Sequence, residues 1–128
     1  MPLSRLSNVF ACLVVLTSLP ATASAACNPA DASMAGAYYM RGVMEIGSII
    51  ALAPDGRFRY MLSYSAYDER AEGCWQRRGN VVTLTPTKML TGPGGKKFKR
   101  LDLRRNANGE LLRTFSPRHT GRYVRGRR

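Results

Sequence analysis

The stretch YSAYDERAEGCWQRRGN, residues 64–80, collects the side chains best suited to chemistry. Asp68, Glu69 and Glu72 stand close together, and two carboxylates can divide acid and base roles when their environments separate their pKa values. The alternative is a charged connection between two strands, because surface loops are normally polar and solvated. We favour the connection. A small hydrolase that uses the carboxylates of 68–72 is therefore the least favoured of three functional classes.

No other grouping of residues predicts catalysis. The single histidine, His119, stands in a basic, turn-like segment without a Gly-x-Ser-x-Gly nucleophile motif. The acidic spacing of a calcium loop is missing, so we expect no metal and no cofactor. Residues 92–97, GPGGKK, lack the Ser or Thr that follows Gly-Lys in phosphate-binding loops, and they are better interpreted as a flexible hairpin loop. We expect a protein that is not an enzyme.

Residues 1–25 have the layout of a secretory signal peptide. Arg5 precedes an apolar run at 9–16, and Ala-Ser-Ala at 23–25 forms a small-residue cleavage site. We predict export to the periplasm or out of the cell after cleavage near Ala25/Ala26, which leaves one domain at 26–128. The apolar run is shorter than the roughly 20 residues that span a bilayer, so we expect no transmembrane segment in the mature chain.

Export also predicts the cysteine chemistry. Cys12 would leave with the signal peptide, so the mature chain keeps Cys27 and Cys74. Two cysteines in an oxidising compartment most simply form one disulfide. The alternative is lipidation of Cys27, which stands beside the cleavage site, and it would leave Cys74 without a partner.

Alternation of apolar and polar residues predicts the fold. In 57–64 the aromatic and apolar side chains fall at every second position, which is typical of a half-buried strand. Similar strands are expected at 36–42, 47–53, 74–78, 81–85, 99–105, 110–115 and 121–125, with a short helical turn within 28–35. Tight turns, such as Gly79-Asn80, join several of them. This pattern predicts an all-β antiparallel meander of about eight strands closed into a barrel, and a flattened sandwich is the alternative.

The run LAPDGRFRYMLSYSAYDERAEGCWQRRGNVVTLTP, residues 52–86, resembles uncharacterised small exported proteobacterial proteins. The matching positions are Asp55, Gly56, Phe58, Tyr64, Ala66, Asp68, Gly73 and Trp75. More loosely, the layout is similar to lipocalin-like barrels. The resemblance implies a β-fold and an exported location, and it implies no activity. If Trp75 points inward, Cys74 points outward, so the disulfide should hold the N-terminal segment against the outer surface.

Charge is the most informative feature for function. The chain has a net charge of +12. Residues 26–87 hold six arginines and six acids, whereas 88–128 hold thirteen basic residues and two acids. A one-sided positive field attracts anions, and exported proteins meet anionic lipids, glycolipids and acidic glycans rather than nucleic acid. The candidate contacts are Lys96, Lys97, Lys99, Arg100, Arg104, Arg105, Arg122, Arg125, Arg127 and Arg128. The alternative is a solvated basic face that only aids solubility.

The first functional class is therefore an exported envelope protein that binds an anionic partner through this basic C-terminal face. The second is a carrier of a small apolar ligand, such as a lipid. An eight-stranded barrel is either filled by its own side chains or holds one small ligand. Phe58, Tyr60, Leu62 and Trp75 would form the ligand walls in that case.

Overall fold

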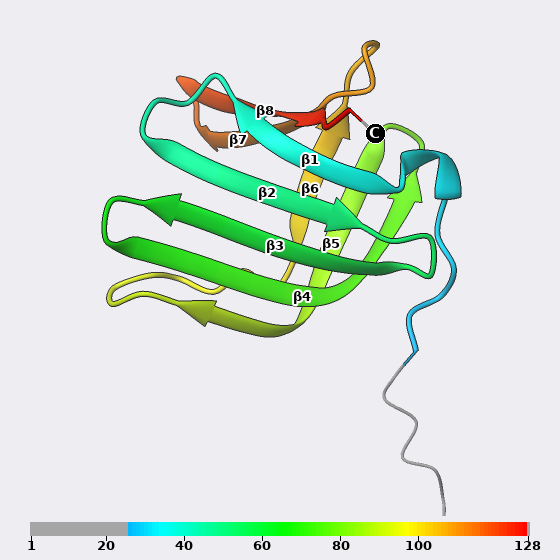
Figure 1. Cartoon of the computed structure of the whole chain (residues 1–128), viewed down its shortest axis with the longest axis horizontal. Helices are drawn as coiled ribbons and strands as arrows, with labels where there is room; N and C mark the ends of the chain where they lie inside the picture. Colours follow the sequence, from blue (N-terminus) through cyan, green and yellow to red (C-terminus); the bar gives the residue numbers. More distant parts are fainter. Residues whose placement is uncertain (1–25, 128) are drawn as a thin grey trace, which may run out of the picture.

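Eight antiparallel strands form a closed barrel in the computed structural model, which describes residues 26–127 (Figure 1). Each strand pairs with the next along the chain, and the last pairs with the first. The strands are β1 (Gly36–Arg41), β2 (Ile46–Leu52), β3 (Arg57–Tyr64), β4 (Tyr67–Arg78), β5 (Val81–Thr91), β6 (Leu101–Arg105), β7 (Leu111–Ser116) and β8 (His119–Arg125). The predicted meander barrel is confirmed, and the closure between β1 and β8 excludes the sandwich. The expected helical turn is the 3₁₀ helix η1 (Ala32–Met34).

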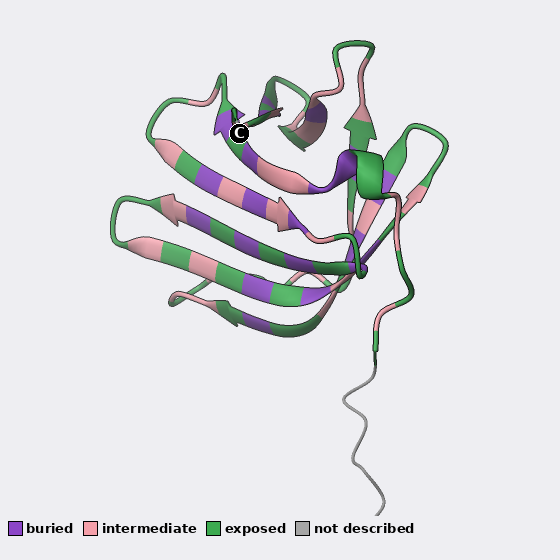
Figure 2. Ribbon diagram, turned by 45° about the vertical axis from the view of Figure 1, so that its right-hand side comes forward, coloured by how far each residue is buried: buried purple, intermediate pink, exposed green. Residues whose placement is uncertain are grey.

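The core lies inside the barrel because side chains along each strand alternate between its two faces. In β3 the residues Phe58, Tyr60 and Leu62 are buried, and the residues between them are exposed. Figure 2 shows this alternation as purple and green bands along β3, and β2 alternates between purple and mainly pink bands. Trp75 on β4 is fully buried, and its indole Nε1–H donates to Ala53 O at 2.8 Å. The period-two pattern therefore predicted the inner face of β3 correctly.

One expectation about 64–80 was wrong. The residues interpreted as a charged connection belong to β4, which begins at Tyr67 and continues for 12 residues, and only Ser65 and Ala66 form the turn. The pairing of β4 with β5 shifts register between Glu72 and Gly73. A Cβ atom at Gly73 would lie 2.2 Å from Thr85 O, so this irregularity requires glycine. The stretch looked like a loop because its inward positions include Tyr67 and Glu69 as well as apolar residues.

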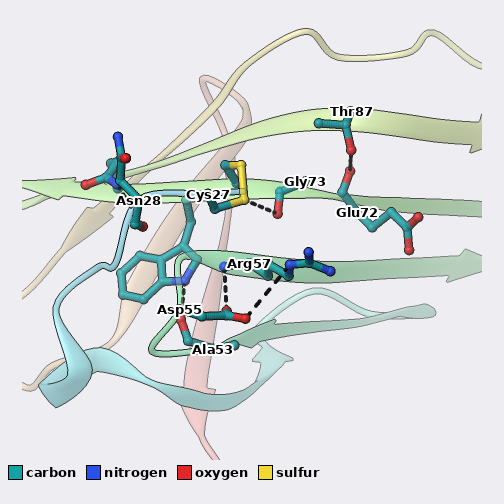
Figure 3. Close-up of a disulfide and its surroundings, with 11 residues drawn as sticks. Cys27, Asn28, Ala53, Asp55, Arg57, Glu72, Gly73 and Thr87 are labelled. Atoms are coloured by element: carbon teal, nitrogen blue, oxygen red, sulfur yellow. Dashed lines mark hydrogen bonds and ion pairs between the residues drawn. A yellow bond between two sulfur atoms is a disulfide. The ribbon is translucent and has the colours of Figure 1, made fainter. Parts of the chain in front are cut away.

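The N-terminal segment 27–35 covers one end of the barrel, here named the closed end. Met34 is buried there, and Tyr38 Oη donates to Met34 O at 2.8 Å. A disulfide joins Cys27 to Cys74, as predicted, and holds the segment against the outer side of β4 (Figure 3). Lipidation of Cys27 is incompatible with this bond. In the described part of the chain, no helix is long and apolar enough to cross a membrane.

The opposite end of the barrel, here named the mouth, follows from the meander topology. Successive connections alternate between the two ends, so 42–45, 65–66, 92–100 and 117–118 all lie at the mouth. In Figure 1 these connections stand on the left, and the connections of the closed end stand on the right. The longest of them, 92–100, folds back so that the Phe98 ring packs edge-on against Tyr60, with ring centroids 5.3 Å apart.

Candidate functional site

The connections at the two ends of the barrel carry opposite net charge. The mouth connections hold five cations, Lys96, Lys97, Lys99, Arg100 and Arg118, and one acid, Glu45. The closed end, made of residues 26–35, 53–56, 79–80 and 106–110, holds three acids and no cation, and Arg127 follows β8 there. The mouth connections therefore have a net charge of +4, against −3 for the connecting residues of the closed end.

The acids of the closed end are already paired. Asp31 lies 2.7 Å from Arg77, and Glu110 lies 2.8 Å from Arg122. Hydrogen bonds from Ser33 and Arg77 lower the pKa of Asp31. At the mouth, by contrast, Arg100 pairs with Asp102 at 3.0 Å, and Lys96, Lys97, Lys99 and Arg118 are exposed without an ion pair to any described residue.

Apolar side chains are exposed among these cations. Met44, at the tip of the 42–45 connection, is 88% exposed, and Tyr64 and Phe115 are exposed at the mouth ends of β3 and β7. Isolated exposed apolar side chains are common on proteins and need no explanation. Here three of them come from three different strand pairs and share one end with four unpaired cations, which makes the mouth amphipathic.

The ten predicted anion contacts are divided between several parts of the barrel. Lys96, Lys97, Lys99 and Arg100 lie together in the 92–100 loop at the mouth. Arg104 and Arg122 lie on the outer wall, since both pair with Leu112 across neighbouring strands. The strand alternation places Arg105 on the other face from Arg104. Arg127 follows β8 at the closed end, and Arg128 lies outside the described residues.

Arg125 has a structural role. Its guanidinium donates to Tyr38 Oη at 2.6 Å and to Ser33 O at 2.7 Å, and it lies over the Tyr38 ring. These contacts tie β8 to η1 and help to hold the N-terminal segment over the closed end. Tertiary contacts of this kind cannot be predicted from the charge of a residue.

A polar network occupies the inside of the barrel below the mouth. Tyr60 Oη and Tyr67 Oη donate to the two carboxylate oxygens of Glu69, at 2.5 and 2.8 Å. Arg113 Nη1 donates to Tyr60 Oη at 2.8 Å, so one hydroxyl joins the cation to the carboxylate. The guanidinium also lies over the Phe115 ring, 4.5 Å from its centroid. Burial, together with the bond to Glu69, raises the pKa of the Tyr60 hydroxyl.

Sequence reasoning missed Arg113, although a signal was present. Arg113 stands two residues after the buried Leu111, so it shares the inward phase of β7. Glu69 likewise shares the inward phase of Ala71 and Trp75 in β4. β4 and β7 are not neighbours in the sheet. Their inward side chains, Glu69 and Arg113, share one interior only because the sheet closes into a barrel. The network therefore depends on the barrel topology.

The four predicted ligand-wall residues all point into the barrel. Phe58, Tyr60, Leu62 and Trp75 are each at most 6% exposed and belong to a single core cluster. That cluster also contains Met34, from the segment that covers the closed end. Each of the four side chains is thus packed among other core residues.

The carboxylates of 68–72 point in different directions. Glu69 points into the barrel, whereas Asp68 and Glu72 are exposed on the outer face, and Asp68 accepts from Ser63 Oγ at 2.7 Å. His119 Nδ1 lies 2.9 Å from Ser116 Oγ, and no described Asp or Glu is hydrogen-bonded to that ring. Within residues 26–127, no three His, Cys, Asp or Glu side chains are placed to hold a metal ion.

The chain was compared with known proteins at the level of families, of individual sequences and of structures. It matches no protein-family model, no curated protein and no solved structure at a significant level. The architecture and the site therefore carry the functional argument alone.

Proposed function

We propose that this protein is an exported, non-enzymatic binding module that docks, mouth first, on an anionic surface of the cell envelope. The observation that carries the proposal is the amphipathic mouth, where a net charge of +4 on the connections surrounds exposed Met44, Tyr64 and Phe115. The cations and the apolar tips would contact such a surface at the same time.

Membrane interfaces reward both features. Each Lys or Arg near an anionic leaflet contributes about 1 kcal/mol of attraction, and apolar side chains gain by burial at the boundary between headgroups and acyl chains. Lys96, Lys97 and Lys99 stand in one loop, so they can approach headgroups together. Phosphorylated glycolipids and phospholipids present the same anionic chemistry to these lysines.

Export supports the choice of partner. The leader-like residues 1–25 and the disulfide between Cys27 and Cys74 both fit an oxidising compartment outside the cytoplasm. In that compartment the abundant polyanions are lipid headgroups and acidic glycans, and nucleic acid is not expected. The closed end, where Asp31, Asp55 and Glu110 lie, would face away from the surface.

Two triple variants with equal net charge test the proposal. Lys96→Gln, Lys97→Gln and Lys99→Gln remove three charges from the mouth. Arg78→Gln, Arg104→Gln and Arg127→Gln remove three exposed charges elsewhere. At about 1 kcal/mol each, the mouth variant should lose about 3 kcal/mol, or about a hundredfold in affinity for anionic vesicles.

The assay is sedimentation of the protein with vesicles of phosphatidylglycerol and phosphatidylcholine, repeated at several salt concentrations. Wild-type binding should weaken as salt rises, because salt screens exposed charges, and pure phosphatidylcholine should bind poorly. The control variant should lose much less affinity than the mouth variant. Equal losses in the two variants would show that only net charge matters, and binding that ignores salt would remove the electrostatic basis of the proposal.

A further inference from the structure

A hollow lies on the outer wall of the barrel, away from the mouth connections. Its volume is about 420 Å³, and it is lined by outward side chains of β2, β3, β4 and β5. A second hollow of about 400 Å³ adjoins it, shares Arg59 and Glu72, and extends to Cys27 at the disulfide; Figure 3 shows Glu72, Thr87 and Arg57 beside that bond.

Strand register explains why this wall is amphipathic. Ile49 pairs with Met61, Met61 with Arg70, and Arg70 with Leu90, so one outward row crosses four strands. The adjoining row pairs Ala51 with Arg59, Arg59 with Glu72, and Glu72 with Lys88. The first row is mainly apolar and the second is mainly charged. Leu90 is 57% exposed and Met61 is 36% exposed, so this apolar floor faces solvent.

The charges of the hollow favour an anion. Arg59, Arg70 and Lys88 face a single carboxylate, that of Glu72. Among the described residues, none of these three cations makes a side-chain hydrogen bond or an ion pair within 4.0 Å. Cations such as Arg77, Arg100 and Arg122 elsewhere on the barrel do have acidic partners. The hollow therefore has a net charge of +2 over an apolar floor.

We propose that this hollow binds a single-chain anionic amphiphile, with its chain on Ile49, Met61 and Leu90 and its anionic group held by the side chains of Arg59 and Lys88, which flank Glu72. The volume falls within the roughly 300–1,000 Å³ of small-molecule sites. The site is separate from the mouth, so a failure of the membrane-docking proposal would not refute it.

Dodecanoate below its micelle concentration is the probe. Calorimetric titration at low ionic strength should show dodecanoate binding, with much weaker binding of hexanoate, which lacks the chain length, and of dodecyl maltoside, which lacks the charge. Amide shifts in ¹H–¹⁵N spectra should change along β2 to β5. Shifts confined to inward core residues would place the ligand inside the barrel and overturn the proposal.

Variants separate this hollow from the mouth. Arg59→Gln with Lys88→Gln should raise the dissociation constant about tenfold, since each exposed ion pair contributes up to about 1 kcal/mol. Glu72→Gln should lower it, because the variant removes a like charge from beside the bound anion. The control Lys96→Gln with Lys97→Gln should leave it within about twofold. Equal loss in the control, no effect of Glu72→Gln, absence of binding, or tighter binding of polyglutamate than of dodecanoate would each refute the assignment.

Discussion

Removal of Glu69 tests the buried network most sharply. Glu69 accepts hydrogen bonds from Tyr60 and Tyr67, and through Tyr60 it faces the Arg113 guanidinium. Hydrogen bonds to a charged group contribute about 1.5–3 kcal/mol each. The Tyr67 hydroxyl can turn toward water more easily than the buried Tyr60 hydroxyl, so losing its bond to Glu69 should cost less. Glu69→Leu also leaves Arg113 without the carboxylate that balances it. From the loss of these two hydrogen bonds we expect the free energy of unfolding to fall by about 3 kcal/mol.

The double variant makes the prediction specific to the network. Arg113→Met alone removes the bond to Tyr60 and the contact with the Phe115 ring, and it should cost about 2 kcal/mol. In Glu69→Leu with Arg113→Met, neither charge remains unbalanced. The two losses should therefore fall short of additivity by about 1–2 kcal/mol, within the range seen for residues that share a network.

Urea unfolding followed by tryptophan fluorescence provides the measurement. The chain contains one tryptophan, and Trp75 is fully buried, so it reports loss of the core. Asp68→Asn is the matched control, because Asp68 is the neighbouring acid but points outward, and it should change stability by about 0.5 kcal/mol or less. Additive single losses, or a Glu69→Leu loss no larger than that of the control, would refute the network as an energetic unit.

Three further outcomes follow from the fold. Replacing Cys27 and Cys74 by serine opens a loop of sequence separation 47, so urea unfolding should show a loss of about 4 kcal/mol on the chain-entropy estimate; an unchanged midpoint would contradict it. Gly56→Ala should destabilise far more than Gly79→Ala, because both glycines have positive φ but only at Gly56 would a Cβ meet backbone, 1.9 Å from Asn28 O; equal thermal midpoints would contradict this. The pKa of Asp31 is lowered from 3.8 in the folded state, so its contribution is present above that value and is lost as pH falls through the folded-state pKa. Asp31→Asn should thus be less stable than wild type at pH 7, and the difference should shrink as pH falls below 3.8; a constant difference would contradict the assigned ion pair.

Local sequence patterns predicted the strands because their determinants are local. The alternation of Phe58, Tyr60 and Leu62 specifies an inward face without knowledge of the neighbouring strands. Gly79-Asn80 likewise specifies a tight turn between β4 and β5. The same alternation, with Trp75 inward, turns Cys74 outward, where the disulfide to Cys27 forms.

Features that depend on closure of the sheet were harder to predict. The first half of β4 was assigned to a connection because Tyr67 and Glu69 are polar. Arg113, which is linked to Glu69 through the Tyr60 hydroxyl, lies 44 residues after Glu69. Polar inward positions resemble loop composition until the partner on the distant strand is known. The cations of the last third are separated for a similar reason, since alternation turns Arg104 outward and Arg105 to the other face.

The outer hollow was missed for a third reason. Its cations Arg59, Arg70 and Lys88 come from three strands, and two of them stand in the half of the chain with no net charge. Only the register of β3, β4 and β5 brings them together. The net charge along the sequence indicates only the last third of the chain. The outward residues of β2 to β5, taken strand by strand, would have indicated this wall.

The direct test of mouth-first docking is the depth of two reporter residues at a membrane. Met44→Trp places a tryptophan at the mouth, and Val81→Trp places one on β5 beside the 79–80 turn of the closed end, with wild-type Trp75 as the background. Anionic vesicles that contain brominated lipids quench tryptophans that enter the bilayer interface. The proposal predicts quenching and a blue shift for Met44→Trp and neither for Val81→Trp. Equal quenching of both, or quenching of Val81→Trp alone, would contradict it.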